Sequence, residues 1–187
     1  MFTVLLFRHC VLFVLLIVCV YTDVARGKIY NWCTLPAIAL GLGTNYVLGG
    51  LVEGGLTGTN LLSSAVALAL VGVLFGWPYL RGGIAAGDVK LVLAVAAIGG
   101  MHRYFTAYAL LYSALVGALM ALLVFIWRGE LWEGLKKGVR FTFSVGWVGR
   151  GEDAEEGPAP ITVPYGCAIA IGSIIAWFLV ELPAVPA

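Results

Sequence analysis

Hydrophobic residues along this chain gather into six long runs, and polar residues are concentrated in the connections between them. A run of about 20 apolar residues is what an α-helix needs to cross a bilayer. The pattern therefore predicts an all-α, polytopic membrane protein with about six transmembrane helices. The predicted helices cover residues 4–22, 32–52, 60–80, 84–100, 104–127 and 160–180.

The fourth run, residues 84–100, is the shortest. At 1.5 Å per residue it extends about 25 Å, which is less than the roughly 30 Å of a bilayer's hydrocarbon core. We therefore expect one of its ends to lie at or inside the membrane interface.

Composition supports the membrane assignment and excludes other classes. The 187 residues are 61% hydrophobic and 11% charged, whereas soluble domains carry about 25% charged residues. The net charge is only +1, and the basic residues are too scattered to follow a phosphate backbone. Nucleic acid is therefore not a predicted partner.

The basic residues instead predict the topology, because cytoplasmic loops are enriched in Lys and Arg. Two of them, Arg8 and Arg103, fall on one side of the predicted membrane. The others fall on the opposite side: Arg26, Lys28, Arg81, Lys90, Arg128, Lys136, Lys137, Arg140 and Arg150. The connections after the first, third and fifth runs, including a long polar loop over residues 128–159, are thus predicted to be cytoplasmic, with both termini outside.

A cleaved signal peptide is the alternative interpretation of the first run, since Arg8 and His9 precede a short apolar core. The basic residues that follow this run, Arg26 and Lys28, outnumber Arg8. That balance favours an uncleaved transmembrane helix.

Asp23 and Asp88 are the only acidic residues outside the long loop and the outer face. Asp23 directly follows the first run, and Asp88 lies at the start of the fourth, so the predicted topology places both at the cytoplasmic boundary. Ionisable groups at membrane depth are costly and usually functional. The alternative for Asp88 is a helix N-cap, which does not fit Asp23 at the end of a helix.

Helix electrostatics predict different protonation states for the two acids. The macrodipole favours the anionic form of Asp88 at a helix N-terminus and disfavours that of Asp23 at a helix C-terminus. If the fold brings the two together, they form the half-protonated pair that an aspartic protease uses. On this argument Asp88 is the base and Asp23 the acid.

Other catalytic classes lack the residues that they need. The four cysteines show no C-x-x-C spacing, and the two histidines form no H-E-x-x-H. No G-x-S-x-G motif is present for a serine hydrolase. We therefore expect neither a metal nor another cofactor.

Three segments resemble motifs of the type IV prepilin peptidases, the leader peptidases among the GxGD aspartyl proteases. The segment GGIAAGDVKL, residues 82–91, is similar to the G-x-G-D-x-K-L signature, and Asp23 with the downstream RGKIYN is similar to the first catalytic Asp and its R-x-I-P-N segment. The segment ITVPYGCAIAIG, residues 161–172, resembles the P-Y/F-x-x-A-x-x-x-G segment of the last helix. The resemblance covers essentially the whole chain.

Two positions depart from the family pattern. Ala85 stands where the first glycine of G-x-G-D is usual, and Tyr30 stands where proline is usual. An alanine at position 85 would be costly if that position required a positive φ. Without the proline, we expect a looser start to the second helix.

The resemblance implies an aspartic endopeptidase, a single membrane-embedded domain over residues 1–187 with Asp23 and Asp88 as catalytic residues. Its implied partners are the lipid bilayer of the cell membrane and a type IV prepilin-like or preflagellin-like precursor, whose short basic leader it removes at the cytoplasmic face. The implied substrate-binding or supporting residues are Gly87, Lys90, Asn31 and Pro164.

The resemblance is to the short, peptidase-only form of the family. The chain contains nothing that corresponds to the cysteine-rich region of larger members, so we expect no methyltransferase activity. Whether the protein is a homo-oligomer is left open.

The competing class is a proton-coupled transporter or an assembly factor for pili or secretion, in which paired acids relay protons. Such a protein would need ionisable groups across the whole membrane. The outer half of the predicted helices has almost none.

Overall fold

The computed structural model of the chain describes residues 2–81, 84–128 and 165–180. Over these residues the protein is all-helical, as predicted, without a β-strand. Each predicted apolar run coincides with one α-helix. The α-helices are α1 (Phe2–Arg26), α2 (Asn31–Gly49), α3 (Leu61–Leu80), α4 (Ala86–Gly99), α5 (Phe105–Arg128) and α7 (Tyr165–Val180), and the connections hold the 3-10 helices η1 (Gly55–Thr57) and η2 (His102–Tyr104). The predicted loop over residues 128–159 lies almost entirely outside the described residues.

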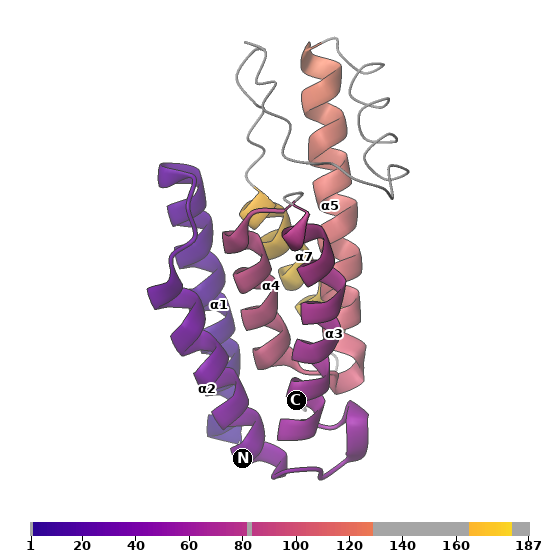
Figure 1. Ribbon diagram of the computed structural model, residues 1–187. Coiled ribbons are helices and arrows are strands. Elements are labelled where there is room, and N and C mark those ends of the chain that lie inside the picture. The colour runs from indigo at the N-terminus through magenta and orange to yellow at the C-terminus, as the bar shows by residue number, and fades with distance from the viewer. Residues whose placement is uncertain (1, 82–83, 129–164, 181–187) are drawn as a thin grey trace.

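The described α-helices form an up-and-down bundle (Figure 1). Helices that follow one another from α1 to α5 contact each other, and α7 packs against α5 and α1. The C-terminal end of α1 and the N-terminal ends of α2, α4 and α7 therefore lie at one end, which we call the upper end as drawn in Figure 1.

α4 is the central helix of the bundle. It contacts α1, α2, α3, α5 and α7, and nine of its 14 residues are buried. Most of its surface is therefore covered by the other helices. At about 1.5 Å per residue it is roughly 21 Å long. It is thus even shorter than the predicted fourth run, and its upper end is recessed relative to the longer α1.

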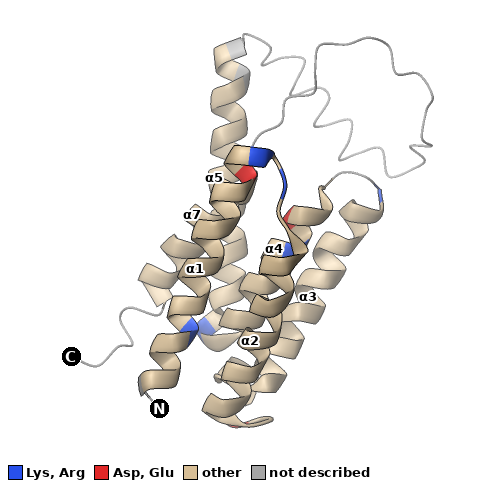
Figure 2. Ribbon diagram, turned by 90° about the vertical axis from the view of Figure 1, so that its left-hand side faces the viewer, with Lys and Arg blue, Asp and Glu red and all other residues tan. Residues whose placement is uncertain are grey.

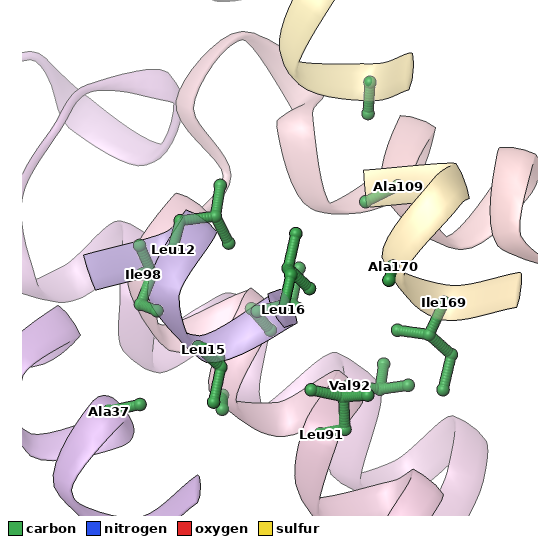
Figure 3. Packing of buried hydrophobic residues seen from close by; sticks show 14 of the residues in the cluster. Leu12, Leu15, Leu16, Ala37, Leu91, Val92, Ile98, Ala109, Ile169 and Ala170 are labelled. Atoms are coloured by element: carbon green, nitrogen blue, oxygen red, sulfur yellow. The ribbon is translucent and has the colours of Figure 1, made fainter. Parts of the chain in front are cut away.

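Apolar side chains from five helices meet around α4 (Figure 3). Leu12, Leu15 and Leu16 of α1 belong to this cluster, as do Leu91, Val92 and Ile98 of α4, and Leu12 lies beside Ile98. Buried residues of the other helices complete the cluster, among them Ala37, Ala109, Ile169 and Ala170. This packing fixes where the first turn of α4, with Asp88, lies relative to α1.

A polar contact anchors the opposite end of α4. The buried Asn45 of α2 donates through Nδ2 to the carbonyl oxygens of Ala97 and Ile98, at 3.1 and 2.9 Å, and to Oγ of Ser64 at 2.6 Å. Carbonyls at a helix C-terminus have no partner within their own helix. Asn45 supplies that partner, and the Nη1 of Arg8 donates in turn to its Oδ1 at 3.4 Å.

Three described stretches are long and apolar enough to cross a bilayer, namely Thr3–Arg26, Leu61–Leu80 and His102–Val124. α7 is apolar but shorter. Together with the composition, these helices make the chain a membrane protein. Six crossings, with both termini outside, remain a prediction.

Candidate active site

Asp23 lies in the last turn of α1, and not after the helix as the apolar pattern predicts. The helix continues to Arg26 and ends at Gly27, whose φ of 61° lies in the left-handed region. The Gly27 amide donates to the carbonyl oxygen of Asp23 at 2.8 Å, the type of contact that closes helix C-termini. The backbone of Asp23 is thus held in a regular helical turn, and its side chain is half-buried.

Asp88 lies in the first turn of α4 but is not the helix cap. The N-cap residue is Ala85, and α4 has no side-chain cap hydrogen bond. The alternative interpretation of Asp88 as an N-cap is therefore wrong. Its carboxyl group is half-buried and is available for another role.

The two carboxylates converge at the upper end of the bundle. α1 and α4 are in contact, and the acidic positions on both helices lie near this end (Figure 2). Asp23 lies near enough to Asp88 for its charge to act on that carboxyl group. Residues that are 65 positions apart in the sequence therefore share one site.

Gly166, in the first turn of α7, holds the Asp23 carboxylate. Its amide donates to Oδ2 of Asp23 at 3.0 Å. A Cβ at position 166 would lie only 2.6 Å from the same oxygen, so only glycine fits without a shift. Amides in the first turn of a helix are free to bind anions. Asp23 thus faces the positive end of α7 as well as the negative end of its own helix. The sequence-based assignment of acid and base considered only the dipole of α1 at Asp23 and not that of α7.

Tyr165 adds a hydroxyl group near Asp88. Its side chain is half-buried and lies within electrostatic range of Asp88. Its ring packs on Gly117 of α5, where an added Cβ would lie 2.8 Å from the ring. Neither Tyr165 nor Gly166 is among the site residues predicted from the sequence. Both lie in the segment over residues 161–172, which resembles the last helix of the family. That resemblance was the sequence feature that could have pointed to these two residues.

Three of the predicted supporting residues lie at the same, upper end of the bundle as the two acids. Lys90 of α4 donates through Nζ to Oδ1 of Asn31, the first residue of α2, at 2.8 Å. Gly87 packs against Ile29, where an added Cβ would lie 3.1 Å from the Ile29 Cβ. Pro164 lies outside the described residues.

The two departures from the family pattern are accommodated without strain. Ala85 has φ −69° and ψ 142°, an ordinary extended conformation. Position 85 therefore does not require a positive φ, and alanine has no conformational cost there. Tyr30 is the N-cap residue of α2 with φ −90°, and its hydroxyl accepts a hydrogen bond from Arg26 at 3.3 Å. α2 still begins at the next residue.

The fold and the paired carboxylates define a helical membrane protein with an ionisable site at one end of its bundle. The sequence profile of the type IV leader peptidase family matches residues 10–122, more than half of the chain and both aspartates. The chain therefore belongs to the type IV leader peptidase family, and the family assigns it a protease role. No curated protein and no solved structure matches it.

Proposed function

We propose that the protein is an aspartic endopeptidase that removes the short basic leader of prepilin-like or preflagellin-like precursors at the cytoplasmic face of the cell membrane. Asp23 and Asp88 are the catalytic residues, and residues 1–187 act as one domain. The observation that carries the proposal is the position of these two carboxylates at the same end of the bundle, on two helices that contact each other, both within the family match.

The two acids activate water together. One carboxylate takes a proton from a water molecule placed between them as the water oxygen attacks the scissile carbonyl carbon, and the protonated partner gives its proton to the carbonyl oxygen. The resulting tetrahedral diol collapses when the first carboxyl group gives its proton to the leaving nitrogen, the C–N bond breaks, and the second carboxylate takes back a proton from the diol. Oδ2 of Asp23 accepts from Gly166, so a proton held on Asp23 in this state is on Oδ1. We assign the shared proton to the pair and not to one residue.

The supporting residues position this machinery. The contact between Lys90 and Asn31 ties the first turn of α4 to the start of α2, and Gly87 lets α4 approach Ile29. We expect these residues to keep Asp88 at its distance from Asp23.

Cleavage of a synthetic precursor tests the proposal. The probe has a basic leader that ends in glycine, followed by an apolar residue, a glutamate and an apolar helix of about 20 residues. Asp23→Asn and Asp88→Asn should each lower the cleavage rate at least about 100-fold. Glu53→Gln, which changes an acid outside the catalytic pair, should retain the wild-type rate. Cleavage by either Asn variant at the wild-type rate would rule out the two-aspartate mechanism.

The same preparation tests the expected absence of methyltransferase activity. With a methyl donor present, the purified protein should leave the new N-terminus of the product unmethylated. Mass spectrometry of the product decides, and a methylated N-terminus would contradict the peptidase-only assignment.

A further inference from the structure

An apolar groove of about 580 Å³ runs between α1 and α7. Its walls include Phe13, Ile17 and Val20 of α1 and Ala170 and Ile174 of α7, and no charged side chain lines it. Ile17 is 67% exposed, so the groove opens sideways, toward the lipid of a bilayer.

Aromatic contacts join α1 and α7 near the lower end of the groove. Phe13, which lines the groove, packs edge-to-face on Trp177 of α7 with ring centroids 5.0 Å apart. His9 packs on the same Trp177 ring, with centroids 5.6 Å apart.

The upper end of the groove adjoins the catalytic pair. Asp23 follows the groove residue Leu16 by seven positions, or about two helical turns, so it lies on nearly the same side of α1. On α7, Gly166 precedes the groove residue Ala170 by one turn. The hydrogen bond between Gly166 and Asp23 therefore joins the two groove walls at their upper end.

The length of the groove and its apolar lining indicate which kind of segment it can bind. From Phe13 to Ala25 it follows α1 for about 18 Å, the length of roughly 12 helical residues. An uncharged lining cannot pair with a basic leader, but it suits an apolar helix laid into a groove. The small side chain of Ala170 allows a helix to approach closely.

We propose that this groove binds the apolar helical segment of the precursor, so that the scissile peptide bond lies beside Asp23 and Asp88. The inference rests on the proposed protease function and names its substrate-docking surface. The basic leader then lies beyond the upper end, outside the groove.

Filling the groove tests the inference. Val20→Trp adds bulk inside it, and Val73→Trp makes the same change on α3, at a side chain that is 79% exposed and outside the groove. Val20→Trp should raise KM for the synthetic precursor about tenfold with a much smaller change in kcat, since it removes binding and not chemistry. Val73→Trp should leave both constants within about twofold.

A truncated peptide separates the groove from the catalytic pair. This peptide keeps the leader and the scissile bond but lacks the apolar helix, and wild type and Val20→Trp should cut it with equal kcat/KM. An equal loss on both substrates, or an equal effect of Val73→Trp, would overturn the proposed docking surface.

Photocrosslinking gives a second test that does not depend on the folding of Val20→Trp. A photoreactive phenylalanine analogue replaces Ile17, or Val73 as the control, in vesicles that contain the synthetic precursor. The inference is supported if adducts with the precursor form from position 17 and not from position 73. Lipid adducts alone from position 17, or equal precursor adducts from both positions, contradict it.

The two proposals can fail separately. If the Asn variants lose cleavage while position 17 never crosslinks to the precursor, the protease mechanism stands and the groove assignment is wrong. If position 17 crosslinks while the Asn variants still cleave, the docking surface stands and the catalytic assignment is wrong.

Discussion

At the scale of single residues, Asp23 is oriented by contacts from two helices. The Gly27 amide holds its backbone carbonyl, and the Gly166 amide holds its carboxylate. The second contact crosses 143 sequence positions. It gives α7, which lies outside the family match, a direct part in the site.

Gly166→Ala should lower kcat at least about tenfold with KM within about twofold. The added Cβ would lie 2.6 Å from Oδ2 of Asp23 and would push the carboxylate out of place. Steady-state cleavage of the synthetic precursor measures both constants, and thermal unfolding checks that the variant is folded.

Two other glycines serve as controls for this substitution. A Cβ at Gly172, on the same helix, would overlap the backbone of Ser113, whereas one at Gly72 would meet nothing. Gly172→Ala should therefore lower the unfolding temperature, and Gly72→Ala should change neither stability nor rate appreciably. If Gly166→Ala behaves like Gly72→Ala, the carboxylate does not depend on this contact.

Ala85→Gly should restore the usual family residue without a gain in activity. Because Ala85 already has φ −69°, glycine relieves no strain, and kcat/KM should stay within about twofold. Cleavage kinetics of this single variant provide the check. An increase of tenfold or more would mean that the working enzyme needs a conformation at residue 85 that alanine resists.

At the scale of the elements, the position of α4 determines where Asp88 lies. The helix is short and surrounded, and Asn45 supplies hydrogen bonds to two carbonyls at its lower end. Removing that partner leaves buried acceptors without a donor, which costs more than the bond itself contributes.

Asn45→Leu should therefore destabilise the protein by about 1–3 kcal/mol. Tyr46→Leu changes the adjacent, exposed side chain of the same helix and should have little effect. Denaturant unfolding in detergent compares the two variants. Equal stabilities would show that the lower end of α4 is held by apolar packing alone.

At the scale of the whole molecule, the sequence predicted the helices and the acidic pair because both depend on simple patterns. Apolar runs in the sequence marked all six described α-helices. The basic residues between these runs predicted that Asp23 and Asp88 lie on the same side of the membrane. The predicted topology put both residues at one boundary of the membrane, but whether they come together depended on how the helices pack.

Contacts that depend on packing between distant segments could not be predicted. Arg8 was counted with the basic residues of the outer side, yet its side chain is only 1% exposed within α1 and bonds to Asn45. The contact of Gly166 with Asp23 and the backbone conformation of Ala85 likewise depend on neighbours in space. No periodicity of hydrophobic residues reports such neighbours.

The central claim is that Asp23 and Asp88 act as one catalytic unit, and the double variant tests it most directly. Groups that act together are not additive, so Asp23→Asn, Asp88→Asn and the variant with both changes should all fall to the same residual rate of precursor cleavage, about 10²–10⁴-fold below wild type. A single variant that retains more than about a tenth of the wild-type rate, with a further fall in the double variant, would contradict the claim.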